Sequence, residues 1–416
     1  MIRMFITLLV ITCTGVLHAA GQVNANEFNP EVSLILDGRY TDIDEGELSL
    51  PGFQLGGEAG LPANGFSMGH NELQISANID DKFFGLMAAP IIYANGETTV
   101  ELEEAYLETL ALGAGFTIKA GRFFSGLGYL NAVHQHAFDF ADAPLVYDAL
   151  YGRKLVEDGI QLRWVAPTAM FLQFGVEANT GSAYPSGSTE DNENNKGEVA
   201  FAKIGSDIGA SSSWQLGVSH YQAEFATREA GAHSHGGDDH DEHTADNELL
   251  DGEVDISGVD FVYKWAPNGN SKQTLFKFQA EYFVRNEKAT SEFTENADSA
   301  TAELDGEQSG FYAQAVYQFM PKWRVGVRYD QLTADNKITD FVDNGIDEDE
   351  YLEESSLGAE KDPTRSSIMV DYSPSHFSRI RLQYSTLDQG HEDGETIDAL
   401  TLQYVVSLGS HGAHQF

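Results

Sequence analysis

The feature that most constrains the fold is a stretch of alternating side chains between Gly306 and Leu332. Apolar residues alternate with glutamines in its first half and with arginines in its second half, and Met320-Pro321-Lys322 separates the halves. A period of two indicates β-strands, because successive side chains of a strand point to opposite faces. The short joint predicts an antiparallel hairpin. A β-sandwich tolerates such a hairpin, whereas a membrane barrel requires its one apolar and one polar face.

The same alternation recurs in about sixteen runs between residues 32 and 408, an even number typical of outer-membrane barrels. Short turns and long polar connections alternate between these runs, with one exception near Asn95. A barrel with short periplasmic turns and long outer loops gives this order, whereas a sandwich has no reason to place every long loop at one end. The predicted fold class is therefore all-β, a transmembrane antiparallel β-barrel of about 16 strands. The expected long connections are 45–69, 123–157, 179–196, 226–252, 288–306, 333–363 and 388–395.

The tryptophans give an independent indication of a membrane barrel. Each of them lies within a few residues of a predicted short turn. Indole rings prefer the headgroup level of a bilayer, so these side chains would form one girdle at the periplasmic rim. Tryptophans that fill a soluble core would not share one height. The four residues are Trp164, Trp214, Trp265 and Trp323.

The first residues have the pattern of a secretory signal peptide. Arg3 gives a positive start, a short apolar core follows, and small residues come after it. This apolar core is too short for a membrane-spanning helix. We therefore expect residues 1–25 to be a signal peptide that is cleaved after Ala20 or Ala25, and residues 26–416 to form the barrel.

Composition limits the surroundings and the ligands of the chain. The 65 acidic and 24 basic residues give a formal net charge of −41, which excludes charge-driven binding to nucleic acid. After the leader, no apolar run approaches the roughly 20 residues of a membrane helix. The only cysteine, Cys13, lies in the leader, so the barrel is expected to have no disulfide. The expected location is the cell outer membrane, in contact with its lipid and lipopolysaccharide.

The apolar residues of each strand determine which polar residues face the lumen. In the penultimate predicted strand Ile380 and Leu382 would face lipid, so their neighbours would face inward. Charged side chains cannot face acyl chains without a large cost in free energy, which supports this assignment. The same parity directs other basic side chains inward and predicts a basic strip in an otherwise acidic protein. The strip consists of Arg163, Lys277, Arg324, Arg328, Arg379 and Arg381.

The stretch 123–157 is too apolar for a solvated loop tip, since it contains Phe138 and Phe140. In sixteen-stranded porins the loop at this place folds into the barrel and narrows it. Opposed charges at such a neck would create a transverse field that orients polar solutes. The alternative is that the stretch packs on the outer rim or between subunits. If it folds inward, the acids that would face the basic strip are Asp139, Asp142 and Asp148.

The expected outer loop 226–252 holds a dense group of metal-ligating side chains. Imidazoles suit zinc, copper and nickel, and carboxylates add charge and further ligands. Because no thiolate is available, a zinc or other divalent ion bound there would be labile. The alternative is a solvated acidic loop whose affinity for metal has no role. The residues are His233, His235, Asp238, Asp239, His240, Asp241, Glu242 and His243.

His134 and His136 form a second, sparser group. Their spacing would let them share a metal ion if the local chain is extended, although two histidines in a loop are more often ordinary polar groups. Barrel hydrolases need an ordered nucleophile or acid–base set. Acidic residues lie near these histidines, but no serine has the sequence context of a nucleophile. We therefore do not expect an enzyme.

The runs EEAYLE (103–108), 120–152 and 159–178 resemble a family of Gram-negative outer-membrane proteins. Its members are often labelled zinc-regulated and sometimes TonB-dependent receptors, and the resemblance is strongest over residues 100–185. It implies a porin-like channel made under zinc limitation. The receptor label does not fit, because such receptors need a plug domain and a larger barrel.

Together these observations predict a porin-like channel for passive diffusion of small solutes or ions, linked to uptake of zinc or another divalent metal. The alternative is a non-transporting surface barrel that binds metal or adheres to other surfaces. No resident cofactor is required in either case, and a homotrimer is compatible with both.

Overall fold

The computed structural model describes residues 30–94, 97–187, 196–229, 245–295, 298–392, 394 and 396–409. Strand segments dominate it. The first nine are β1 (Glu31–Ile43), β2 (Gly65–Met68), β3 (Asn71–Asn78), β4 (Phe83–Ala94), β5 (Glu97–Val100), β6 (Glu104–Thr109), β7 (Phe116–Phe124), β8 (Val156–Val165) and β9 (Phe171–Asn179). The others are β10 (Lys196–Ile208), β11 (Ser212–Glu229), β12 (Ala245–Trp265), β13 (Leu275–Glu295), β14 (Asp298–Met320), β15 (Trp323–Asn344), β16 (Thr364–Ser375), β17 (Ser378–Asp388) and β18 (Thr396–Gly409).

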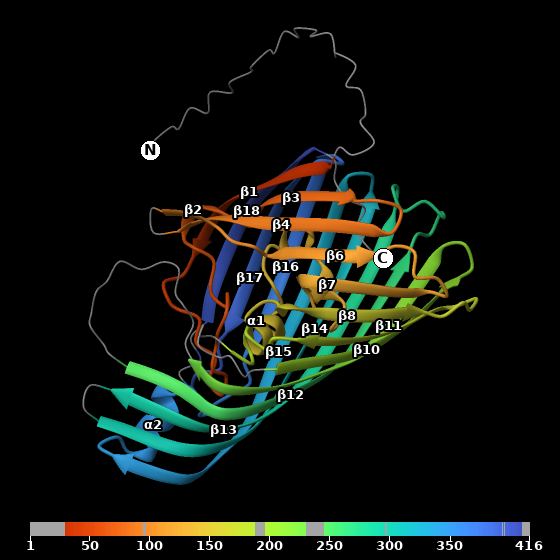
Figure 1. Cartoon of the computed structure of the whole chain (residues 1–416). Coiled ribbons are helices and arrows are strands. Elements are labelled where there is room, and N and C mark those ends of the chain that lie inside the picture. The colour runs from red at the N-terminus through yellow and green to blue at the C-terminus, as the bar shows by residue number, and fades with distance from the viewer. Residues whose placement is uncertain are drawn as a thin grey trace, which may run out of the picture.

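These segments form one antiparallel sheet that closes on itself, because β18 pairs with β1 (Figure 1). Two of the strands are interrupted. β2 and β3 both pair with β1, and β5 and β6 both pair with β4. With each interrupted pair taken as one strand, the 18 segments make a closed barrel of 16 strands, as the sequence predicts.

The alternation of exposed and buried side chains confirms the predicted parity. In β17, Ile380 and Leu382 are exposed on the outer surface, whereas Arg381 is buried inside. The tryptophans also lie where the sequence places them, each within three residues of a strand end that borders a short connection. An apolar outer band with indoles at one rim is the surface that a bilayer requires.

Four strands are longer than predicted. β12 to β15 have 21 to 23 residues, about twice the 9–11 that cross a membrane. Figure 1 shows them projecting beyond the other strands, with helix α2 (Glu348–Glu354) near their tips. The predicted long loop 288–306 is therefore wrong: β13 and β14 pair up to Glu295 and Asp298.

Small side chains explain this error, because much of the alternation in the extension rests on alanines such as Ala300 and Ala302, which give a weak apolar signal. The predicted loops 226–252 and 333–363 are also shorter than expected, since β11 ends at Glu229, β12 begins at Ala245 and β15 continues to Asn344.

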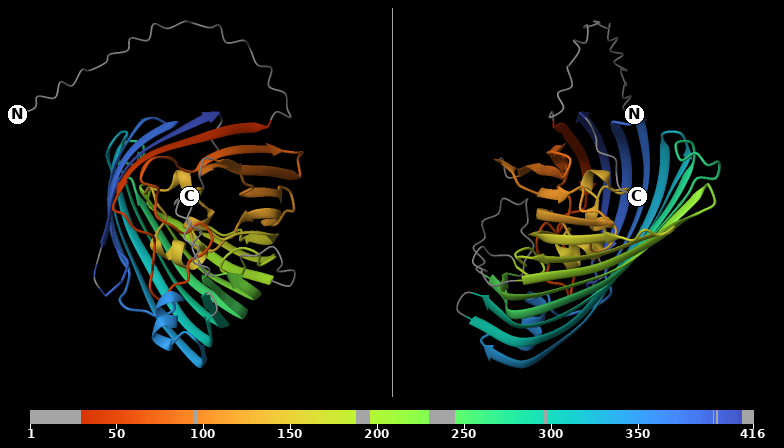
Figure 2. Two further views of the ribbon diagram at one scale, coloured as in Figure 1. Left: turned by 90° about the vertical axis from the view of Figure 1, so that its left-hand side faces the viewer. Right: turned by 45° about the vertical axis from the view of Figure 1, so that its right-hand side comes forward.

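Two connections fold into the barrel rather than over its rim. The left view of Figure 2 shows the segment between β7 and β8, with helix α1 (Leu145–Tyr151), inside the ring of strands. The segment 44–64 joins it, and Leu50 and Phe53 are buried in the same apolar core as α1. The sequence predicts the first inward segment as its favoured alternative and misses the second. Among the described residues, no helix is long and apolar enough to cross a membrane.

Candidate functional site

The segment between β7 and β8 is held at the centre of the barrel by backbone packing. It contains two short 3-10 turns, Leu130–Ala132 and Gln135–Ala137, and then α1, whose seven residues are all buried. Gly152 ends α1 with φ of 55°, a conformation that favours glycine. Its carbonyl oxygen accepts a hydrogen bond of 3.0 Å from the backbone N–H of Glu58. The two inward segments therefore dock partly through their backbones, in addition to the apolar side-chain core that they share.

Asp139 connects the inward segment to two strands of the wall. Its carboxylate lies 2.9 Å from Lys277 Nζ on β13 and 2.9 Å from Arg324 Nη1 on β15. Arg324 also pairs with Asp371 at 2.6 Å. Burial alone would raise the pKa of Asp139, but the charges of Lys277 and Arg324 outweigh burial and lower this pKa below its ordinary value. Asp139 is therefore an ionised anchor.

Asp142 forms a second anchor, three residues further along. Its Oδ2 lies 2.9 Å from Arg328 Nη2 on β15 and 2.9 Å from Arg365 Nη1 on β16. Arg328 in turn pairs with Asp330, whose other oxygen accepts the backbone N–H of Leu145 at 3.0 Å. The start of α1 is thus tied to the same charged network.

The remaining arginines of the predicted strip contact backbone. Arg379 donates to the carbonyl oxygen of His136 at 2.7 Å, and Arg381 donates to that of Phe138 at 2.9 Å. The structure does not bring the other two predicted residues into this network. Asp148 pairs with Arg153 of its own segment at 3.2 Å. Arg163 pairs with Glu108 on β6 at 2.5 Å.

Sequence reasoning missed three members of the network: Arg365, Asp330 and Asp371. The signal was present for Arg365 and Asp371, because both share the inward parity of a predicted strand whose outward face carries Ile368. Asp330 and Asp371 lie between the arginines of the wall and separate their charges.

Little free space is left around this network. A cavity of about 50 Å³ lies between the inward segments and the wall, with Arg39, Asp142, Arg153 and Arg365 in its lining. Further along the lumen, α1 packs with side chains of the long strands into an apolar core that includes Tyr147, Phe283 and Tyr312. Within the described part of the chain, the lumen is therefore closely packed around this network and around α1.

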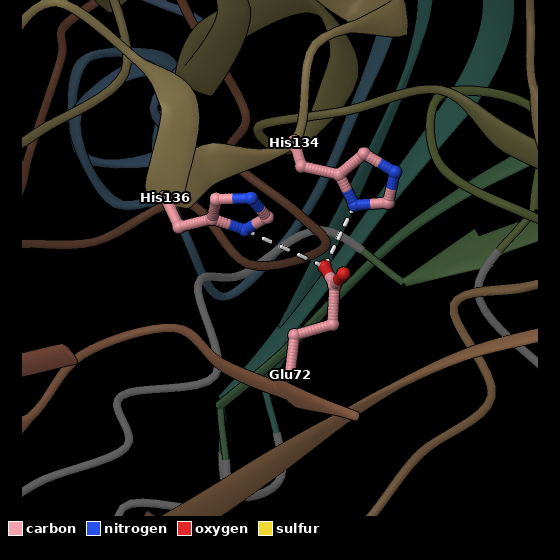
Figure 3. Close-up of side chains that lie close together, drawn as sticks. All are labelled: Glu72, His134 and His136. Carbon is pink, nitrogen blue, oxygen red and sulfur yellow. Dashed lines mark hydrogen bonds and ion pairs between the residues drawn. The ribbon is translucent and has the colours of Figure 1, made fainter. Parts of the chain in front are cut away.

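A group of histidines and glutamates lies where the inward segment meets β3, and Figure 3 shows three of its members. Glu72 on β3 is at its centre. Its Oε2 lies 2.7 Å from His134 Nδ1, 3.3 Å from His70 Nε2 and 3.7 Å from His136 Nδ1. Glu103 Oε2 lies 3.4 Å from His70 Nε2 and 3.6 Å from His134 Nδ1.

Burial and charge act in opposite directions on this group. The Glu72 side chain is fully buried, and His70 and His136 are less than a tenth exposed. Burial alone would lower the pKa of His134, but its hydrogen bonds with Glu103, Glu104 and Glu72 outweigh burial and raise this pKa well above its ordinary value. The group therefore stabilises positive charge.

The predicted spacing of His134 and His136 does bring their rings together, 5.6 Å apart, but through a 3-10 turn rather than an extended chain. His70 and Glu103 lie within predicted strand runs, 70–80 and 99–109, but alternation does not mark either residue as a ligand. Both lie where a barrel strand is interrupted, between β2 and β3 and between β5 and β6.

The metal-ligating group expected in the outer loop lies outside the described residues, as does the expected signal peptide. This applies to His233, His235, Asp238, Asp239, His240, Asp241, Glu242 and His243.

Comparison with solved structures places the fold among outer-membrane barrels of Gram-negative bacteria. OprB of Pseudomonas putida is 10% identical with a TM-score of 0.52, covering 91% of this chain and 94% of that one. The outer membrane channel DcaP of Acinetobacter baumannii is 14% identical with a TM-score of 0.51, covering 91% and 96%. OmpT, an outer membrane protein of Vibrio cholerae, is 11% identical with a TM-score of 0.50, covering 93% and 99%. At these identities the likeness concerns the fold.

Sequence comparison finds a nearer relative. No family model matches the chain. An uncharacterized protein of Aquifex aeolicus (strain VF5) is 30% identical over 413 residues, which cover 94% of this chain and 80% of that protein. The chain therefore belongs to the same family as this Aquifex aeolicus protein.

Proposed function

We propose that this barrel is a porin-like channel for passive diffusion of small solutes or ions. The observation that supports this best is the charged lining, in which Asp139 and Asp142 of the inward segment oppose arginines of β15 and β16. Opposed charges across a narrow interior of low dielectric create a field that orients polar solutes.

The volume of this cavity determines which solutes can pass without a conformational change. A space of about 50 Å³ accommodates only a few water molecules. Larger solutes require the inward segment to move away from the wall. Opening the buried ion pairs costs free energy, but water that enters the gap can solvate both charged partners. Water cannot compensate in this way for exposure of the apolar core around α1.

Uptake of zinc or another divalent metal is the specific role that we propose for the channel. The acidic outer connections attract cations, and the histidine-rich part of 226–252 combines imidazoles with carboxylates, which suit a labile zinc ion. The resemblance to zinc-regulated outer-membrane proteins points the same way. No resident cofactor is needed for passive diffusion.

Single-channel current of the refolded protein in a planar bilayer tests the proposal. We expect stable current steps, and micromolar zinc should change them. A variant that lacks residues 233–243 should keep the steps but lose the response to zinc. Steps that respond to zinc equally with and without these residues would disprove the role of the loop and leave the channel intact.

A second candidate function is a non-transporting surface barrel that binds metal or adheres to other surfaces. One observation favours it: the apolar core that α1 forms with the long strands fills the lumen. Refolded protein that binds zinc but passes no current would support this candidate over the channel.

The proposal also covers the oligomeric state of the barrel and its lack of enzymatic activity. OmpT of Vibrio cholerae has been solved in a trimer form, and a homotrimer in outer-membrane lipid fits the apolar outer band of this barrel. We propose no enzymatic activity and no binding to nucleic acid. The absence of enzymatic activity can be tested directly. It would be contradicted if the refolded barrel hydrolysed phospholipid or peptide and a change of His134 abolished this hydrolysis.

A further inference from the structure

We propose that His70, Glu72, Glu103, His134 and His136 form a binding site for one divalent transition-metal ion of the zinc type inside the barrel. The site is separate from the histidine-rich outer loop. Its existence does not depend on conduction, so it goes beyond the proposed channel function.

Two distances within the group match those of a metal-ligand set, and the 2.7 Å between Glu72 Oε2 and His134 Nδ1 would lengthen when an ion binds between them. Ligands at about 2.0–2.1 Å from a tetrahedral zinc ion lie roughly 3.3–3.4 Å from one another. In the structure, Glu72 Oε2 and His70 Nε2 are 3.3 Å apart, and Glu103 Oε2 and His70 Nε2 are 3.4 Å apart. Two triads of ligand atoms, Glu72 with His134 and His136 and Glu72 with His70 and Glu103, each lie within 4.8 Å of one another. They share Glu72, so one ion could draw ligands from both.

The charge of the pocket also favours a dication. Glu72, Glu103 and Glu104 are all largely buried, and Lys154 is a cation that interacts with all three. With neutral imidazoles as ligands, Lys154 offsets one of three negative charges, and a divalent ion balances the other two. Glu72 Oε1 is buried and has no hydrogen-bond partner within the described part of the chain, although a buried carboxylate oxygen normally has one.

The position of the site follows from the elements that supply its ligands. His70 lies in the break between β2 and β3, and Glu103 lies in the break between β5 and β6. The flanking segments pair with opposite sides of β4, so the two breaks place both side chains near Glu72. His134 and His136 come from the inward segment. A bound ion would therefore link that segment to the wall at a place that the network of Asp139 and Asp142 does not reach.

Metal binding can be measured on the full-length refolded barrel without measuring current. The outer loop is first silenced in a background variant with His233→Ala, His235→Ala, His240→Ala and His243→Ala. Titration calorimetry with zinc should then show one equivalent bound. Titration with cobalt should give visible absorption bands of N/O ligation without the sulfur charge-transfer band. Zinc should also raise the thermal unfolding midpoint of the background variant, because an ion that binds only the folded state stabilises it.

The Glu72→Gln and His134→Gln changes, made together in the same background, should weaken zinc binding at least 100-fold and abolish the thermal shift. The matched control is His220→Gln, since His220 is a half-exposed histidine on β11 that lies in neither triad. The control should bind zinc as the background does. If the double variant does not fold, His136→Gln alone should weaken binding at least 10-fold.

A purely hydrogen-bonded histidine–glutamate network is the competing explanation. It predicts a folded background variant that binds no zinc, or equal zinc binding by the background, the Glu72/His134 variant and the control. Either result would overturn the proposal. Loss of the channel current alone would not affect it, because the readout is binding.

Discussion

At the scale of single residues, Arg328 is the best test of the interior network. It is almost fully buried between Asp142 and Asp330, at 2.9 Å from each. Replacing it with methionine removes the nearer arginine partner of the buried Asp330, whose other arginine, Arg365, is 3.6 Å away. We expect this to lower the free energy of unfolding by about 3 kcal/mol. Urea unfolding of the refolded barrel measures this change.

The matched control for Arg328→Met breaks an exposed pair instead. Lys337 and Asp335 are 3.8 Å apart and both 71% exposed. Lys337→Met should change the free energy of unfolding by less than about 1 kcal/mol, because water and salt screen such pairs. Equal effects of the two changes would mean that the interior network contributes no more to the free energy of unfolding than a surface pair does.

Asp139 gives a prediction for pH dependence. Lys277 and Arg324 lower its pKa in the folded state despite burial. The contribution of Asp139 to the free energy of unfolding is therefore fully present above the pKa of an aspartate in the unfolded chain, which is about 3.9. It is lost as the pH falls through the lower pKa that Asp139 has in the folded state. The difference in free energy of unfolding between wild type and Asp139→Asn should stay constant from about pH 7 to pH 5 and shrink below about pH 4. A difference that already shrinks between pH 7 and pH 5 would contradict this assignment.

Much of the network at this scale could be predicted from the sequence, because parity alone decides which side chains face the lumen. Lys277 and Arg328 were found in this way. Of the histidine–glutamate group, the sequence predicts only the pair His134 and His136, since His70 and Glu103 lie where the period of two is broken. A rule based on alternation fails wherever the backbone departs from a regular strand.

At the scale of elements, the contact between the inward segments depends on Gly152. A Cβ atom there would lie 2.6 Å from the carbonyl oxygen of Gly56. Its φ of 55° adds about 1–2 kcal/mol of strain for any L side chain. Gly152→Ala should therefore lower the free energy of unfolding by more than about 2 kcal/mol and make the segment accessible to limited proteolysis.

Gly60→Ala is the control for this contact. Gly60 lies in the partner segment 44–64, and a Cβ atom added to it would meet no atom within 4 Å. The change should leave the free energy of unfolding within about 0.5 kcal/mol of wild type. Equal protease resistance of wild type and Gly152→Ala would show that the docking does not require the glycine.

The barrel elements were more predictable than the segments inside them. Each predicted run contains an observed strand, because lipid on one side and polar lumen on the other impose alternation throughout the membrane span. Beyond the membrane this constraint ends, and the extensions of β13 and β14 were missed. The inward packing of 44–64 was also missed, since Leu50 and Phe53 are too few to distinguish a buried loop from a surface loop.

At the scale of the whole molecule, the structure is a closed barrel whose outer surface is adapted to lipid and whose interior is filled by its own chain. The apolar core around α1 and the ion-paired network of Asp139 and Asp142 divide the filling into two parts. Opening the buried ion pairs is costly, but water that enters can solvate the separated charges, whereas no such solvation compensates for exposure of the apolar core. We therefore expect solutes to pass on the charged side.

The most direct test of this account is the single-channel current in a salt gradient of the wild type and of a variant with Asp139→Asn and Asp142→Asn. The control is Asp335→Asn, an exposed acid outside the network. The account predicts current steps for all three proteins and a reversal potential shifted toward anions only in the double variant, because its lumen retains the arginines without their counter-charges. Folded barrels that pass no current, or a double variant with the reversal potential of wild type, would contradict it.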